Sequence, residues 1–373
     1  MENVASARER PQLDAIQACR GIAALLVVAF HLTGLSEKHL GASFAGGWFG
    51  FGWSGVDLFF VLSGFIIFYV HGRDIGRPAR LRGYAWRRFA RIYPLYAILT
   101  LAVLPVYLLG AGEAMKRDPG VIARSLLLLP QPFGVSPVIT VGWSLNVEAL
   151  FYVVFGLLIA LPRRPARILF ASWMALSGAL ALYGALTGPG FVLAHPFVAF
   201  LFDGRNLEFG LGCLCGYAIG RGAVRGAPWL LAAGVTGFVF SGANEAHLWI
   251  DPIQVRLALF GLSAAAIVAG VAALDFGRHL RVPRPLLAVG NASYSIYLTH
   301  GLALGVLVPL VNRLHLASWI GIVPTQLIAM AGALAVGFAC YGLIEKPVLR
   351  RLRSTAAAPR APAKVIAASS PPA

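Results

Sequence analysis

Apolar stretches recur along almost the whole chain, and each runs for about 20 residues, enough for a helix to cross a hydrocarbon core of roughly 30 Å. Helices are the expected spans, because lipid offers no hydrogen-bond partners to an open sheet edge. Most basic residues lie in the short segments between these stretches. The sequence therefore predicts an all-α fold, a polytopic bundle of transmembrane helices.

Composition supports the membrane class. Hydrophobic residues make up 58% of the 373 positions and charged residues only 12%, whereas a soluble domain has roughly 25% charged residues. The stretch 121–129 is too short to cross and is predicted to be interfacial or re-entrant. We predict ten spans, which lie at 13–34, 51–70, 92–110, 142–161, 166–187, 198–220, 228–243, 253–274, 286–309 and 317–344.

The basic residues indicate the orientation of the bundle. With both termini in the cytoplasm, 23 of the 31 Lys and Arg residues fall in inner segments and five in outer loops. This asymmetry follows the positive-inside rule. The net charge of +16 is thereby explained by membrane topology and by anionic lipid headgroups, and no nucleic acid partner is expected.

A single domain with a tail is expected. Residues 1–350 form the transmembrane domain, and residues 351–373, rich in Ala and Pro, are predicted to be a disordered cytoplasmic tail. The first apolar run has no small-residue cleavage site before His31, which predicts an uncleaved span. The cysteines lack CxxC or metal-ligand spacing and are expected to be buried thiols; they are Cys19, Cys213, Cys215 and Cys340.

Ionisable residues inside spans need a reason, because each costs about 2.5–3.5 kcal/mol on insertion scales. Arg20 and His31 lie on the first span, about 16.5 Å apart in rise and within about 20° of the same helix face. One stripe thus carries Arg20 near the cytoplasmic side and His31 near the outer side. The alternative is that Arg20 snorkels to the interface and His31 only bonds a neighbouring helix.

Two carboxylates are predicted at a similar depth to His31. Glu148 lies about 9 Å below the outer end of the fourth span, and Asp57 enters the second span from the same side. A histidine with a nearby carboxylate is suited to take a proton from a hydroxyl. The alternative is that both carboxylates only bind polar groups of neighbouring helices. Trp143 and Ser144, together with Asp57, are candidates to line a substrate cavity.

An arginine cluster stands at the mouth of the third span, in RRFARIYP. Arg88 and Arg91 share a helix face, where their planar guanidinium groups, with Arg87 beside them, can hold phosphates bidentately. Coenzyme A carries several phosphates, so the cluster is a candidate acyl-CoA site. Simple positive-inside anchoring is the competing explanation.

The ninth span carries Tyr294, Tyr297 and His300 on a polar stripe, which either lines a substrate cavity or joins helices. Several familiar motifs are missing. The chain has no Walker-type loop, no HExxH, no GxSxG elbow and no GxGxxG opening a helix. Phosphate-driven transport, a soluble-type serine hydrolase and a metal site are therefore unsupported.

Five landmarks together resemble the acyltransferase-3 family of membrane O-acyltransferases. They are Arg20 and His31, GVDLFFVLSGF at 55–65, RRFARIYP at 87–94, WSLNVEALFY at 143–152 and SYSIYLTH at 293–300. They occur in family order from residue 13 to 345. The resemblance implies about ten spans in a bacterial inner membrane, and transfer of an acyl group from acyl-CoA, acetyl-CoA first among them, to extracytoplasmic glycans, antibiotics or lipids.

The resemblance also implies roles for residues. Arg20 and His31 match the family's essential arginine and histidine, Arg88 and Arg91 its arginine pair, and Glu148 its fourth-span glutamate. The expected mechanism docks the phosphates of acyl-CoA on the inner arginines. His31, oriented by a carboxylate such as Glu148, then deprotonates a sugar hydroxyl or is itself transiently acylated; both routes remain open.

Acceptor and partners are less constrained. The form of WSLNVEALFY is similar to that of members acting on exopolysaccharide. The long C-terminal hydrolase-like domain of some members is missing, so the membrane domain or partner proteins of polysaccharide biosynthesis are expected to bind the glycan. A transporter or flippase for a lipid-linked glycan is the alternative function, with the same polar residues lining a pathway. A purely structural scaffold would leave the buried charges unexplained.

Overall fold

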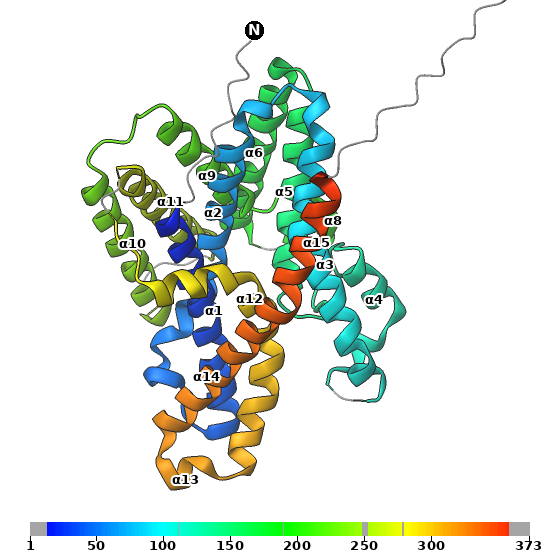
Figure 1. Cartoon of the computed structure of the whole chain (residues 1–373), viewed down its shortest axis with the longest axis vertical. Helices are drawn as coiled ribbons and strands as arrows, with labels where there is room; N and C mark the ends of the chain where they lie inside the picture. The colour runs from blue at the N-terminus through cyan, green and yellow to red at the C-terminus, as the bar shows by residue number, and fades with distance from the viewer. Residues whose placement is uncertain (1–12, 111, 189, 248–252, 278–279, 358–373) are drawn as a thin grey trace, which may run out of the picture.

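The computed structural model describes residues 13–110, 112–188, 190–247, 253–277 and 280–357, and within these ranges it contains helices and no strand (Figure 1). Eight helical segments of this part of the chain are long and apolar enough to cross a membrane. Two further predicted spans correspond to α9 and α10, which are not among the eight. The predicted all-α polytopic membrane fold is confirmed.

The first half of the bundle contains α1 (Asp14–Leu40), the 3-10 segment η1 (Phe44–Ser54), α2 (Gly55–His71), α3 (Leu81–Leu108), α4 (Pro119–Leu126), α5 (Gly142–Ala160) and α6 (Arg163–Thr187). The second half contains α7 (Gly190–Ala194), α8 (Pro196–Leu201), α9 (Asn206–Gly220), α10 (Ala227–His247), α11 (Ile253–Phe276), α12 (Arg284–Arg313), α13 (Leu316–Ile320), α14 (Ile322–Cys340), the π-helical turn η5 (Tyr341–Glu345) and α15 (Lys346–Ala357).

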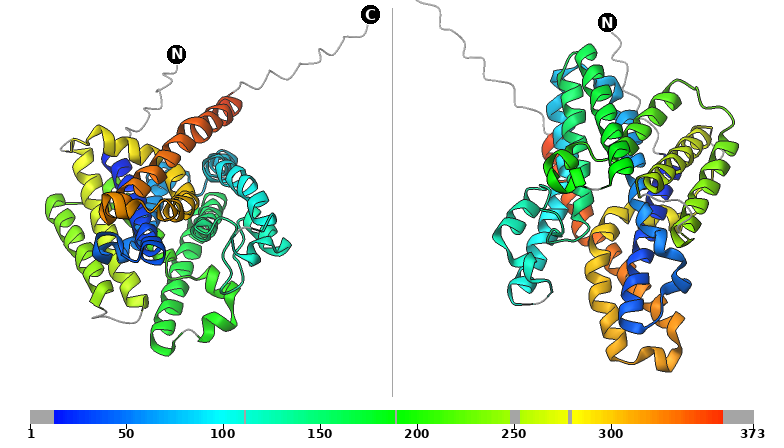
Figure 2. Two further views of the ribbon diagram at one scale, coloured as in Figure 1. Left: turned by 90° about the horizontal axis from the view of Figure 1, so that it is seen from below. Right: turned by 180° about the vertical axis from the view of Figure 1, so that it is seen from behind.

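Helices α1, α12 and α14 pack side by side and form the lower part of the molecule in Figure 1, as the rear view in Figure 2 also shows. Two glycines let α1 and α12 approach closely. A Cβ atom at Gly290 would overlap the backbone oxygen of Gln17, and one at Gly21 would lie 2.9 Å from the Gly290 nitrogen. Small residues at a crossing are the usual means of close packing between membrane helices. This crossing holds α1, which carries Arg20 and His31, against α12.

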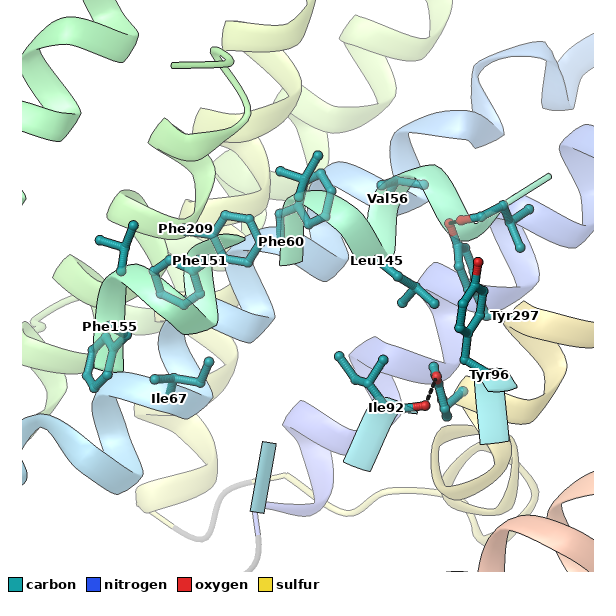
Figure 3. Packing of buried hydrophobic residues seen from close by; sticks show 14 of the residues in the cluster. Val56, Phe60, Ile67, Ile92, Tyr96, Leu145, Phe151, Phe155, Phe209 and Tyr297 are labelled. Atoms are coloured by element: carbon teal, nitrogen blue, oxygen red, sulfur yellow. Dashed lines mark hydrogen bonds between the residues drawn. The ribbon is translucent and has the colours of Figure 1, made fainter. Parts of the chain in front are cut away.

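Helices α2, α5 and α9 meet in the other part of the bundle. The ring of Phe151 on α5 stacks on that of Phe209 on α9, with centroids 4.2 Å apart, and Phe60 on α2 lies 4.8 Å from Phe209. All three side chains are buried, and Figure 3 shows their rings together. Gly64 and Gly212 allow α2 and α9 to approach at backbone contact. Helix α5 is thus enclosed by α2, α3, α6 and α9.

The structure also describes the 121–129 segment, the cysteines and the start of the C-terminal tail. The segment predicted to be interfacial or re-entrant contains the short helix α4, beside α3. The cysteines are free and buried. Helix α15 continues to Ala357, past position 351 where the tail was expected to begin, and residues 358–373 lie outside the described residues.

Candidate active site

A cavity of about 1030 Å³ lies between α1, α2, α3, α5, α12 and α15. Its volume is at the upper end of the roughly 300–1,000 Å³ typical of ligand pockets. Lining residues that are labelled in Figure 3 are Val56, Phe60, Ile92, Leu145 and Tyr297. We call it the donor cavity. Of the residues singled out from the sequence, it brings together Arg20, Arg87, Arg88, Arg91, Ser144, Glu148, Tyr294 and Tyr297.

One end of the donor cavity is basic. Arg87 and Arg88 line it from α3, and Lys346 and Arg350 line it from α15. The Nε atom of Arg88 is buried and has no hydrogen-bond partner, and the guanidinium group lies over the Tyr152 ring at 5.7 Å. An unpartnered guanidinium donor in a cavity is a ready site for an anion, because charge-assisted hydrogen bonds are among the strongest.

Arg91 lines the same cavity but already has a partner. Its guanidinium donates to Glu345 at 2.7 Å, and Ser295 donates to the other Glu345 oxygen at 2.6 Å. Glu345 is only 2% exposed, in the π-helical turn η5. Arg20 lies within electrostatic range of Arg91 and Glu345, and donates to Gln17 at 3.3 Å. Arg88 and Arg91, predicted to act as a pair, therefore have different surroundings.

Glu148 lies inside the donor cavity and not against His31. Ser63 donates to its Oε1 at 2.5 Å, and Tyr152 donates to the same oxygen at 2.6 Å. Among the described residues no hydrogen bond joins Glu148 to His31, so the expected direct contact between the two is absent from the structure. A span's depth follows from the sequence, but the direction in which its side chains point depends on how the helix is rotated in the bundle.

Hydroxyl groups also line the donor cavity. Ser144 on α5 and Tyr297 on α12 hydrogen-bond each other through their hydroxyls at 2.6 Å. Tyr294, one turn earlier, donates to the Ile92 carbonyl at 2.7 Å, the contact drawn in Figure 3. The predicted stripe on α12 thus both lines a cavity and joins helices. The Tyr297 ring contacts the His300 ring at 5.9 Å.

His300 does not line the donor cavity; it contacts His31. Its Nδ1 lies 2.7 Å from the Tyr297 carbonyl, and its Nε2 lies 3.2 Å from His31 Nδ1. A carbonyl only accepts, so His300 carries its proton on Nδ1 and its Nε2 accepts. His31 Nδ1, which is also 2.9 Å from the Val27 carbonyl, must then be the donor. The contacts leave His31 Nε2 with a free lone pair.

Two other predicted lining residues lie away from the donor cavity. Trp143 lines a second cavity across α5, where Arg205 lies over its ring at 5.1 Å. Asp57 is 1% exposed, and its charged neighbours are Arg205, Glu208 and Asp203 rather than His31. The depth predicted for Asp57 does not place it in the donor cavity, because α2 turns this side chain towards α9.

Sequence reasoning missed several residues of the donor cavity. Glu345 and Lys346 lie just beyond the span predicted at 317–344 and were not singled out, although an ionisable residue at a membrane edge is a usable signal. Ser63 and Tyr152 carry no such signal, since hydroxyl side chains are common in spans. Among the described residues, no group of three or more His, Cys, Asp or Glu side chains is placed to hold a metal ion.

Comparison with known proteins gives the same assignment as the motifs. The model of the family described as acyltransferase domain, acyltransferase-3, matches residues 13–342. The chain belongs to the acyltransferase-3 family. This membership makes it a multi-pass membrane acyltransferase, and the donor cavity contains the landmark residues Arg20, Arg88 and Glu148 of the family resemblance.

Proteins similar to this chain have names that indicate several functions. The chain is 31% identical to the exopolysaccharide production protein ExoZ of Rhizobium meliloti, over 82% of this chain and 92% of that protein. It is 28% identical to the acyltransferase MdmB of Streptomyces mycarofaciens, over 82% and 83%. It is 26% identical to the O-acetyltransferase OatA of Staphylococcus aureus, over 80% of this chain and 51% of that protein. No solved structure matches.

Proposed function

We propose that the protein transfers an acyl group, acetyl first among the candidates, from cytosolic acyl-CoA to a sugar hydroxyl of an extracytoplasmic or lipid-linked polysaccharide. One observation carries this proposal. The donor cavity has a basic end at Arg87, Arg88 and Arg350, and its other end at Tyr297 lies one ring contact from the His31–His300 pair. A long anionic donor with a reactive far end fits such a cavity.

The phosphates of acyl-CoA bind at the basic end in this proposal. Arg88 supplies the unpartnered guanidinium, and Arg87, Lys346 and Arg350 add positive charge around it. The acyl arm then lies along the cavity past Arg20 towards Ser144 and Tyr297. Arg91 holds Glu345 and so shapes the cavity wall rather than binding phosphate. The cytosolic origin of the donor rests on the positive-inside rule.

The reaction is an ester exchange at the thioester carbon. His31 Nε2 takes the proton of the sugar hydroxyl while the hydroxyl oxygen forms a bond to the acyl carbon. The carbon–sulfur bond breaks, and the proton passes from His31 to the departing thiolate, which leaves as free coenzyme A. His300 keeps the His31 proton on Nδ1 throughout, because its own Nδ1 proton is held by the Tyr297 carbonyl. Transient acylation of His31 itself is a second route to the same products.

The acceptor class comes from the relatives. ExoZ is named for exopolysaccharide production and OatA for O-acetyl transfer. Both names fit transfer to a glycan hydroxyl outside the cytoplasm, in a bacterial inner membrane. In this orientation both termini, including the tail from 351 to 373, are cytoplasmic, and partner proteins of polysaccharide biosynthesis can deliver the glycan.

The test is acyl transfer in proteoliposomes by His31→Ala, normalised to folded protein. A general base contributes about 10²- to 10⁴-fold, so transfer should fall by at least that factor. Acyl-CoA affinity should be unchanged, because His31 does not line the donor cavity. His39→Ala, the same change in the last turn of α1, is the matched control. Near-normal turnover of His31→Ala would exclude this mechanism.

A further inference from the structure

A second cavity, also about 1030 Å³, lies between α5, α6, α8, α9 and α11 and the 130–137 segment. It faces the opposite side of α5 from the donor cavity. Ser144 and Glu148 line the donor cavity, whereas Trp143, Asn146 and Val147 line the second one. In the orientation favoured by the positive-inside rule, the first turn of α5 is at the outer side of the membrane. The second cavity therefore opens towards the outer leaflet.

Polar atoms without partners line this second cavity, and all of them are hydrogen-bond acceptors. Asn146 is 4% exposed, and its Oδ1 has no hydrogen-bond donor. Gln131 Oε1 also has no donor. The amide donors are occupied within the protein: Asn146 donates to the Leu129 carbonyl at 3.0 Å, and Gln131 donates to Val121 and Ser125. The missing partner must supply several donors.

The charge of the second cavity excludes a phosphate ligand. Its one guanidinium, Arg205, is held by Asp203 at 3.4 Å and lies over the Trp143 ring. Asp57 and Glu208, its other ionisable neighbours, hydrogen-bond each other, so this cluster offers no free cation to a phosphate. An anionic ligand would meet unfavourable potential here. A donor-rich neutral ligand would not.

Aromatic surface completes the site. Trp143 and Phe133 are 39% and 75% exposed, and Phe170, Phe200 and Phe202 also line the cavity. Ring faces beside unpaired acceptors match a molecule with apolar C–H faces and many hydroxyls. We infer that the second cavity binds a neutral sugar unit of the acceptor glycan, next to the unit that is acylated. This inference rests on the proposed function for the identity of the glycan, but the binding chemistry is independent of it.

A hydrocarbon chain is the rival occupant, since the cavity wall is largely apolar. It would leave the oxygens of Asn146 and Gln131 covered and unbonded. A buried polar atom without a hydrogen-bond partner weakens binding. Sugar hydroxyls remove that cost and a lipid tail does not. The acceptors therefore decide between the two.

The experiment is calorimetric titration of the protein in nanodiscs with a panel of neutral tetrasaccharides of glucose, galactose and mannose. At least one should bind. Asn146→Leu and Trp143→Ala should each weaken that binding about tenfold, the effect of losing one hydrogen bond or one ring contact. Phe133→Ala, at an exposed position where folding is not at risk, should weaken it several-fold.

The matched controls are Asn312→Leu and Trp319→Ala, which lie at the ends of α12 and α13 and line neither cavity. They should bind as the unmodified protein does, and acyl-CoA affinity should be unchanged in all five variants, which also verifies folding. Failure of every tetrasaccharide to bind, or full binding by both Asn146→Leu and Phe133→Ala, would refute the inference. If Phe133→Ala weakened the binding of undecaprenyl phosphate but not that of any tetrasaccharide, the cavity would be assigned to lipid.

The outcome is separable from that of the proposed function. Tetrasaccharide binding should persist in His31→Ala, because His31 does not line this cavity. If transfer survived in His31→Ala, the proposed mechanism would fail while the sugar site stood. If transfer were lost as expected but no sugar bound, only the sugar site would fail.

Discussion

The donor cavity and the second cavity have the same volume, about 1030 Å³, and share α5 as a wall, yet their chemistry is opposite. The donor cavity presents guanidinium donors at one end, and the second cavity presents unpaired amide acceptors. Neighbouring residues of one helix, Ser144 and Asn146, face different cavities. The difference teaches that polar residues of a membrane helix need not contact neighbouring helices. Each face of the helix can line a cavity for a different substrate.

If each cavity holds one substrate, the largest effect is expected at the histidine pair to which the proposed mechanism assigns the proton transfer. His300→Leu removes one of the two acceptors for His31 Nδ1–H and leaves only the Val27 carbonyl, so the imidazole is oriented less firmly. We expect kcat to fall about 100-fold, part of what a general base contributes, with little change in KM for either substrate. His300→Gln should recover most of this loss, because its amide can both donate to the Tyr297 carbonyl and accept from His31.

Steady-state kinetics, with the concentrations of both substrates varied, measure kcat and the two KM values separately. A purely structural role for His300 would instead lower the amount of folded protein and leave the kcat of the remainder intact. Equal losses in the Leu and Gln variants would also contradict the positioning role.

An intermediate effect is expected at the basic end, where Arg88 and Arg91 are distinguished by their partners. Arg88→Ala should weaken acyl-CoA binding about 10- to 150-fold, since a hydrogen bond to a charged group contributes roughly 1.5–3 kcal/mol. Arg91→Ala should instead reduce stability by about 2 kcal/mol, because it leaves Glu345 with only Ser295. Acyl-CoA titration and thermal unfolding of both variants make the comparison.

Arg82→Ala, an exposed arginine of the same helix that does not line the donor cavity, is the matched control. Its acyl-CoA affinity and unfolding temperature should equal those of the unmodified protein. If Arg88→Ala bound acyl-CoA normally, the arginine cluster would serve only membrane topology. The donor cavity would then not differ from the second cavity in binding an anion.

The smallest effect concerns the outer segment that walls the second cavity. Lys116 donates to Thr140 at 2.8 Å, just beyond the 130–137 segment, and burial lowers its pKa below the ordinary lysine value. Between the folded and unfolded pKa values the unfolded chain binds more protons, so stability should rise with pH in this alkaline window. Lys116→Met should remove a slope worth about 0.5 kcal/mol.

Unfolding temperatures measured from neutral pH to the ordinary lysine pKa report this slope. Lys38→Met, at an exposed lysine of α1, should leave it unchanged. A Lys116→Met variant with the same pH dependence as the unmodified protein would contradict the assignment.

Much of the fold could be predicted because hydropathy is a property of each segment alone. The first span, the fourth span and the ninth span all recur in α1, α5 and α12. The span predicted at 198–220 is instead broken between α8 and α9, where Asp203 and Arg205 interrupt the helix. A hydropathy window averages over such a break and does not detect it.

The candidate site could be predicted in composition but not in its contacts. Helical spacing correctly places Arg88 and Arg91 on one face, since both line the donor cavity. The expected partner of His31 was Glu148, at a similar depth, and the structure provides His300 instead. Depth follows from rise per residue, whereas the partner depends on the rotation of α12 set by the contact of Gly21 with Gly290. That rotation cannot be derived from the sequence of one helix alone.

The stacked rings of Phe60, Phe151 and Phe209 fill the place where α2, α5 and α9 meet (Figure 3). Phe60 lines the donor cavity, and the neighbours of Phe209, Glu208 and Gly210, line the second one. A continuous polar path between the two cavities would let ions pass, because an ion crosses a polar path at far lower cost than an apolar one. The three buried rings are therefore an apolar barrier that keeps the two cavities electrically separate.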